Sequence, residues 1–180
     1  MQSSIRLRPA RSLGDRVMKV NHAGEEGAIC IYRGQRWVAA KLMPDLVSEL
    51  AEYQSHEERH RAVFAAELSR RGLRRCRSFL LCAGGGTALG VVTGLMGRKA
   101  IAATTVAVER VVLRHLEDQK KSLAAIDLPA VCAIERIERD EQAHHDLSTR
   151  DLGHPMWWQR VLMAIVSAST EAVIWLGMRI

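Results

Sequence analysis

Two short stretches decide the fold of this chain: EERH at residues 57–60 and EQAH at residues 141–144. Each places a glutamate three residues before a histidine. A further glutamate precedes each pair at the same separation, Glu25 before Glu57 and Glu109 before Glu141 (57 − 25 = 141 − 109). The three positions of the first set therefore recur later in the chain at one constant offset (109 − 25 = 141 − 57 = 144 − 60). The chain thus contains one pattern of potential metal ligands twice.

The spacing within each pair favours a helix that presents both side chains to one metal ion. Residues three apart on an α-helix lie about 60° from each other around the axis and about one turn apart along it. Four carboxylates and two imidazoles in this order are typical of a carboxylate-bridged di-iron or di-manganese site in a four-helix bundle. Oxygen and neutral imidazole donors suit either metal. The predicted ligands are Glu25, Glu57, His60, Glu109, Glu141 and His144.

A single glutamate–histidine pair on a charged helix is more often part of a solvated surface than a metal site. Other acidic residues in the chain could be mistaken for ligands, since Glu52 and His56 are four residues apart and Glu26 stands beside Glu25. The internal repeat separates these from the ligand set, because the same offset places Arg110 opposite Glu26 (110 − 26). Asp140 and Asp146 are further candidates, as partners that orient the ligand histidines.

The composition predicts an all-α protein with one domain over residues 1–180. Apolar residues make up 48% of the chain but aromatic residues only 4%, which favours helices over sheets. The ligand-bearing helices are expected to form two antiparallel hairpins, over residues 15–71 and 98–149. Two more apolar helices are expected at residues 79–97 and 157–178. The chain therefore predicts a four-helix bundle with two additional helices.

The two apolar helices indicate contact with a membrane surface. Residues 79–97 carry no charge, and Gly86, Gly90 and Gly94 fall four apart, which permits close helix packing. Trp157 and Trp158 begin the second apolar helix, and indole rings favour a membrane interface. We expect a peripheral, monotopic protein. The alternative is a soluble homo-oligomer that uses the same apolar faces for packing.

The net charge of +6 is compatible with a nucleic acid or an anionic membrane as the partner. The chain shows no nucleic-acid motif and few aromatic residues for stacking on bases. No pair of its four cysteines has the Cys-x-x-Cys spacing of a zinc or iron–sulfur site. The charge therefore favours a membrane surface and not nucleic acid.

Four segments resemble the Coq7/CLK-1 family of demethoxyubiquinone hydroxylases: NHAGEEGA at residues 21–28, IYRGQ at 31–35, VAVE at 106–109 and DEQAHHD at 140–146. The resemblance extends from Arg16 to Ile180. It implies a ferritin-like bundle with two iron ions as cofactor and O2 as co-substrate. The implied reaction is hydroxylation of the ring of demethoxyubiquinol, a prenylated quinol, in ubiquinone biosynthesis.

The resemblance also implies roles for single residues and for partners. The family's metal ligands fall on the same six residues that the repeat selects. It implies that His115, near the quinol ring, and Tyr32, on the first helix, are candidate catalytic residues. This chain departs from the family at Leu116, where other members have a tyrosine. The resemblance further implies a lipid-binding partner of the Coq9 type. The implied location is the cytoplasmic face of a bacterial cell membrane, or the matrix side of the mitochondrial inner membrane in a eukaryote.

Other ferritin-like functions remain alternatives at this point. A rubrerythrin-like peroxidase would need an added iron–sulfur domain, for which the cysteine spacing gives no support. A non-catalytic iron-binding protein of the storage type would need a soluble exterior, which the two apolar segments do not offer. A pure membrane scaffold would not need six ligands in register.

Overall fold

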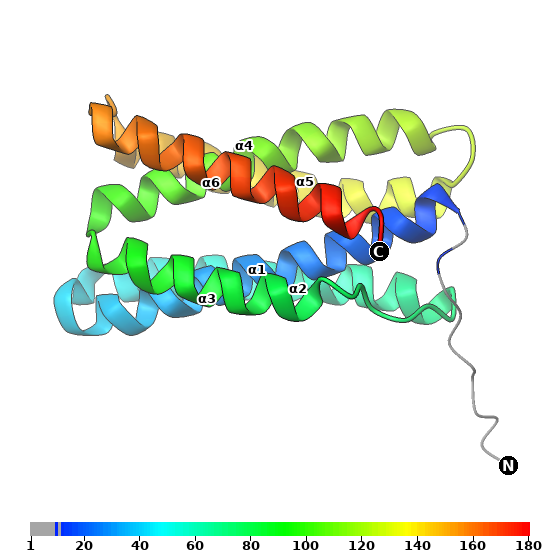
Figure 1. Cartoon of the computed structure of the whole chain (residues 1–180), viewed down its shortest axis with the longest axis horizontal. Helices are drawn as coiled ribbons and strands as arrows, with labels where there is room; N and C mark the ends of the chain where they lie inside the picture. The colour runs from blue at the N-terminus through cyan, green and yellow to red at the C-terminus, as the bar shows by residue number, and fades with distance from the viewer. Residues whose placement is uncertain (1–9, 11) are drawn as a thin grey trace, which may run out of the picture.

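The computed structural model describes residue 10 and residues 12–180, and these residues are almost entirely helical. These residues form six α-helices and one 3-10 helix, η1, and Figure 1 shows how the α-helices are arranged. The prediction of an all-α fold is confirmed, whereas residues 1–9 and 11 of the predicted domain lie outside the described residues. The elements are α1 (Leu13–Leu42), η1 (Pro44–Leu46), α2 (Val47–Arg70), α3 (Phe79–Leu95), α4 (Arg98–Leu123), α5 (Leu128–Leu152) and α6 (Trp157–Gly177).

Local signals set the helix ends close to where the sequence predicts them. The Ser12 hydroxyl accepts a hydrogen bond from the Asp15 amide and caps α1, whereas Asp127 caps α5 through the Ala130 amide. Gly153, with φ of 64°, follows the last residue of α5. The fifth helix therefore runs to Leu152, three residues beyond the predicted end, because no residue before this glycine breaks the helix.

The two predicted hairpins are present and pack against each other. In one, η1 links α1 to α2, and in the other a short turn links α4 to α5. The shared core is apolar and contains fully buried side chains from several helices, including Met18, Phe64, Leu123 and Ile134. Burial of these side chains is the main force that holds the hairpins together.

The two apolar helices cover one side of this bundle. In Figure 1, α3 (green) packs against α1, and α6 (orange to red) packs against α4. Only α6, among the described residues, is long and apolar enough to cross a membrane, by length and composition. Both helices expose large apolar side chains. On α3 or just after it these are Leu80, Leu81, Val92, Leu95 and Met96. On α6 they are Trp157, Val161, Ile165 and Trp175.

Glycines bring α3 close to α1, as the spacing of Gly86, Gly90 and Gly94 indicates. A Cβ atom at Gly86 would overlap the carbonyl oxygen of Gly27, and one at Gly90 would overlap that of Ile31. The backbones of the two helices therefore approach to a distance that only glycine allows.

We expect Gly90→Ala to destabilise the protein by about 1–3 kcal/mol, because the new methyl group forces α3 away from the backbone of α1. The measurement is the free energy of unfolding in urea, followed by circular dichroism. Gly84→Ala is the matched control, since a Cβ there meets nothing within 4 Å. That control should keep or raise the stability, as alanine favours a helix by about 1 kcal/mol over glycine. Equal effects of the two substitutions would contradict close packing as the cause.

Candidate metal centre

The four bundle helices bring all six predicted ligands to one buried place. Glu25 lies on α1, Glu57 and His60 on α2, Glu109 on α4, and Glu141 and His144 on α5. None of the six side chains is more than 6% exposed. They form two groups whose ligand atoms lie within 4.8 Å of one another, one with Glu25 and His60 and the other with Glu109 and His144. Glu57 and Glu141 belong to both groups.

Four buried atoms at this place lack a hydrogen-bond partner. They are Oε1 of Glu57, Oε1 of Glu141, Nδ1 of His60 and Nδ1 of His144. The His60 nitrogen lies 2.8 Å from Glu141 Oε1, and the His144 nitrogen lies 3.2 Å from Glu57 Oε1. Buried polar atoms without partners are costly. Divalent metal ions would satisfy them, so the donor set fits a pair of such ions.

The carboxylates influence one another because water is excluded. Burial, reinforced by the charges of Glu141 and Glu57, raises the pKa of Glu25 well above its usual value. Glu109 shows the same shift, from burial and from Glu141. These directions describe the protein without metal, in which some of the carboxylates are best kept neutral. Metal ions would reverse that preference, since they bind the ionised form.

Glu57 behaves in the opposite way. Burial by itself would raise its pKa, but the side chains of His144, His60 and Glu25 beside its carboxylate outweigh burial and lower the pKa to about 2. Burial likewise disfavours the charged form of His60, but Glu141 and Glu57 raise its pKa to about 11. Without metal, the ionised Glu57 therefore stabilises the protonated His60 beside it.

These shifts predict that two similar substitutions differ in their effect on the metal-free protein. Glu25→Gln replaces a carboxyl group that favours its neutral form, because its pKa is raised. Ionisation of this group therefore adds no stability to the folded protein at neutral pH. It should leave the melting temperature at pH 7 unchanged or raise it. Glu57→Gln removes a charge whose stabilising effect is complete at neutral pH and is lost only as the pH falls towards 2. It should cost about 3–5 kcal/mol, as for a broken buried ion pair.

Thermal unfolding of both variants in the presence of a chelator tests this contrast. The same scans with added Mn²⁺ should show that Glu57→Gln, which changes a ligand shared by both groups, loses more of the metal-dependent stabilisation than Glu25→Gln, which changes a ligand of one group. Equal destabilisation by the two substitutions would contradict the assigned charge states.

The outer nitrogens of the two histidines have different partners. His60 Nε2 lies 3.1 Å from Asp140 Oδ2, so the structure confirms one of the two predicted orienting acids. Asp146 does not fill this role, because its carboxylate contacts Gln142 and His145 on the exposed side of α5. The outer nitrogen of His144 instead lies 2.9 Å from Nδ1 of His56.

Sequence reasoning missed His56 because it sits in a pair with Glu52 that resembles an ordinary surface contact. The internal repeat holds a signal that could have identified His56, because the constant offset of the repeat makes His56 equivalent to Asp140 (140 − 56). Tyr53 was missed as well. Its ring lies against that of His144, with 4.5 Å between the centroids. Nothing in the residue spacing distinguishes Tyr53 from an ordinary core residue.

Tyr32 lies beside the centre, as the sequence predicts. It is buried, and its hydroxyl donates a hydrogen bond of 3.3 Å to Glu109 Oε1. Burial and the charge of Glu109 raise the pKa of this phenol well above its usual value, so it stays protonated and remains a donor. Leu116 is buried in the apolar core, so the expected tyrosine is replaced there by a packing residue.

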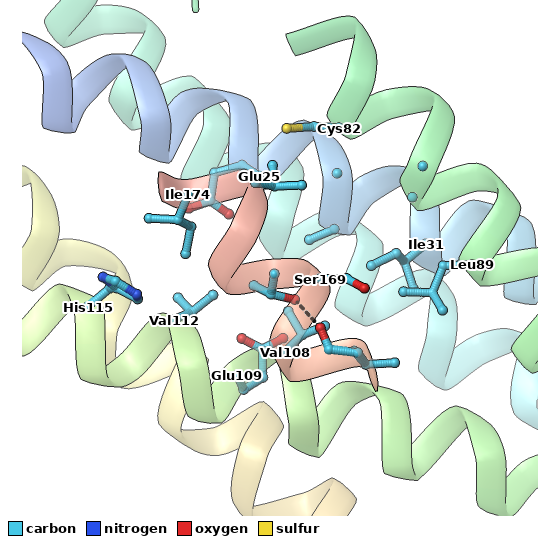
Figure 2. Close-up of a pocket in the computed structure, with 18 of the residues that line it drawn as sticks. Glu25, Ile31, Cys82, Leu89, Val108, Glu109, Val112, His115, Ser169 and Ile174 are labelled. Atoms are coloured by element: carbon cyan, nitrogen blue, oxygen red, sulfur yellow. Dashed lines mark hydrogen bonds between the residues drawn. The ribbon is translucent and has the colours of Figure 1, made fainter. Parts of the chain in front are cut away.

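A cavity of about 480 Å³ reaches the carboxylates from the side that α3 and α6 cover. Figure 2 shows Glu25 and Glu109 at this cavity, among apolar side chains such as Val108, Val112 and Ile174. The walls come from α1, α3, α4 and α6 and are mainly apolar. The cavity therefore suits a ligand with a large apolar part.

His115 lines the same cavity on α4 (Figure 2). Its Nε2 lies 2.8 Å from Glu171 Oε2 on α6. Burial and the nearby Arg114 lower its pKa, which favours a neutral ring. Asn21 and Gln119 also face the cavity and exchange two side-chain hydrogen bonds, of 2.8 and 3.2 Å. These side chains make one part of an otherwise apolar cavity polar.

Residues 12–177 match the model of a protein family described as ubiquinone biosynthesis protein COQ7. The chain belongs to the COQ7 family. It is 32% identical over 169 residues to a 3-demethoxyubiquinol 3-hydroxylase of Rhodospirillum rubrum, across 94% of this chain and 79% of that protein. A mitochondrial NADPH-dependent 3-demethoxyubiquinone 3-hydroxylase of Dictyostelium discoideum is 33% identical over 180 residues, with the same coverage. The human protein of that name is 29% identical over 175 residues, across 95% of this chain and 80% of its own length.

These similarities confirm the family that the sequence motifs indicate. Membership accounts for the whole described bundle, since the match begins at the residue that caps α1 and ends with α6. The matched residues therefore include both ligand-bearing hairpins and both apolar helices, and with them the buried centre and the cavity.

Proposed function

We propose that this COQ7-family chain is a di-iron monooxygenase that hydroxylates the ring of demethoxyubiquinol in ubiquinone biosynthesis. The observation that supports it most directly is the cavity that leads to the six buried ligands, because its apolar walls suit a prenylated ring. The names of the relatives from Rhodospirillum rubrum and Dictyostelium discoideum support the same reaction.

The six ligands would hold two iron ions in two positions. Glu25 and His60 serve one position, Glu109 and His144 serve the other, and Glu57 and Glu141 are shared between them. Iron bound there supplies the chemistry that activates O2. One oxygen atom would enter the ring C–H bond and the other would leave as water. This takes two electrons and two protons, which NADPH, the donor in the name of the Dictyostelium discoideum relative, would supply together with one proton from solvent.

The chain's own residues orient the substrate and handle protons. The apolar walls exclude water and hold the prenyl tail, while the polar part of the cavity receives the oxygens of the ring. The contact with Glu171 requires a proton on His115 Nε2, so the neutral ring leaves Nδ1 free to accept a hydrogen bond from a quinol hydroxyl. Tyr32 keeps Glu109 in place through its hydrogen bond.

Replacing a shared ligand should abolish metal binding and turnover together. We expect Glu57→Ala, reconstituted with Fe²⁺ under anaerobic conditions, to bind less than one iron per chain and to form no hydroxylated quinol when O2 is added. The measurements are metal analysis and chromatography of the quinone product. Glu58→Gln is the matched control, because Glu58 is the neighbouring carboxylate, is exposed and accepts a hydrogen bond from Gln54 on the same helix.

The outcomes of this experiment separate the rival functions. Two irons per chain with O2-dependent hydroxylation support the proposal. Two irons with peroxide reduction but no hydroxylation would indicate a rubrerythrin-like activity. Full hydroxylation by a metal-free variant would contradict the catalytic role of the centre.

We also propose that α3 and α6 attach the protein to a membrane surface, from which the substrate enters. Their exposed apolar side chains lie on the helices that wall the cavity, so an entering quinol need not cross water. Since α6 also packs along α4 and lines the cavity, a monotopic arrangement fits better than a spanning one. A Coq9-type lipid-binding protein remains an expected partner from the family resemblance alone.

The double substitution Leu80→Asp/Val161→Asp should release the protein from phospholipid vesicles, because it puts two charges into the apolar surface. We expect co-flotation with the vesicles to fall at least tenfold while the circular dichroism spectrum is unchanged. Ile126→Asp is the control, since Ile126 is 67% exposed but lies in the turn between α4 and α5. If the control lost vesicle binding to the same extent, α3 and α6 would not be the attachment surface.

A further inference from the structure

The two halves of the centre differ in the partners of their histidines. The internal repeat makes His60 equivalent to His144 and His56 equivalent to Asp140, because both pairs are separated by the constant offset (144 − 60 = 140 − 56). Each histidine contacts the equivalent position on the opposite helix. His60 Nε2 therefore meets a carboxylate at 3.1 Å, whereas His144 Nε2 meets an imidazole nitrogen at 2.9 Å.

The direction of these hydrogen bonds follows from the inner nitrogens. Nδ1 of both histidines faces the carboxylates of the centre and has no hydrogen-bond partner. A metal ion bound at Nδ1 requires the ring proton to be on Nε2, so both outer nitrogens are donors. His56 must then accept through its Nδ1 and carry its own proton on Nε2, which lies 4.0 Å from Glu52 Oε1.

The two acceptors act differently on the ligands. A carboxylate forms a charge-assisted hydrogen bond and raises the basicity of a metal-bound histidine. A neutral imidazole withdraws the proton less strongly. His60 is therefore the stronger electron donor of the two ligand histidines.

A second asymmetry acts in the same direction. The Tyr32 hydroxyl donates a hydrogen bond of 3.3 Å to Glu109 Oε1 and so makes that oxygen a weaker donor to a metal. The repeat places Leu116 opposite Tyr32 (116 − 32), and a leucine has no hydroxyl. The glutamate of the other half, Glu25, consequently has no such phenol at the equivalent position.

We infer that the two metal positions are inequivalent and fill in order, first the position of Glu25 and His60 and then that of Glu109 and His144. This rests on the proposed metal centre and assigns Asp140 and His56 as positioning residues that set the order. Because partners of this kind change metal affinity by about 10–100-fold, the two binding steps should be separated by a factor in that range.

Cobalt titrations of single-position variants test the order. His144→Ala keeps the first position and His60→Ala keeps the second, and both retain the shared Glu57 and Glu141. Binding of Co²⁺ is followed by its visible absorption and by calorimetry, which report on coordination and not on turnover. We expect His144→Ala to bind its single Co²⁺ about 10–100-fold more tightly than His60→Ala.

The orienting residues are then changed within each background. Asp140→Asn should weaken Co²⁺ binding to the His144→Ala protein by about 10–100-fold and leave the His60→Ala protein unchanged, because the latter has no His60 to orient. Conversely, His56→Asp should strengthen binding only in the His60→Ala protein. In each case the other background is the matched control, and circular dichroism checks that all variants fold.

Protein that retains all six metal ligands provides a second measurement if an alanine variant does not fold. There, Asp140→Asn should weaken the first of two Co²⁺ steps, and His56→Asp should strengthen the second. Two equal steps in the unsubstituted protein, or a uniform effect of Asp140→Asn on both positions, would overturn the order while leaving the metal centre intact. Absence of any Co²⁺ binding by the unsubstituted protein would instead overturn the proposed centre itself.

Discussion

Four carboxylates held together in a water-free core are the constraint on which the rest of the structure depends. Glu25, Glu57, Glu109 and Glu141 would repel one another if all were ionised without cations, and the raised pKa values of Glu25 and Glu109 are the consequence. Two histidines relieve part of this repulsion in the protein without metal. The bundle therefore maintains a centre that is poorly satisfied on its own and well suited to two divalent cations.

Such a centre needs a rigid surrounding structure, because a buried polar atom without a hydrogen-bond partner is stabilised by any motion that lets water reach it. Buried apolar clusters in the bundle, one with Phe64 and Ile134 and another with Tyr32 and Leu50, supply the rigidity. The arrangement gives up stability for function, as is common at sites where polar groups are prepared for a ligand. It also explains why the proposed irons would act as structural as well as chemical components.

The two apolar helices turn this centre into a site for an apolar substrate. Glycines hold α3 against the backbone of α1, while α6 packs on α4, and the cavity lies between these layers. The outward faces of the same two helices remain apolar and exposed. One pair of helices therefore walls the cavity and offers the proposed membrane surface, which connects substrate entry with attachment.

The sequence by itself determined the helices, the six converging residues and the family, because each rests on spacing along the chain. Helical periodicity aligns Glu57 with His60, and the internal repeat separates true members such as Glu25 from neighbours such as Glu26. Only the tertiary structure decided that Glu57 and Glu141 belong to both halves, and that His56 and not Asp146 meets a ligand histidine. These contacts join helices far apart in the sequence, and their partners depend on how the helices cross and rotate, which local spacing does not encode.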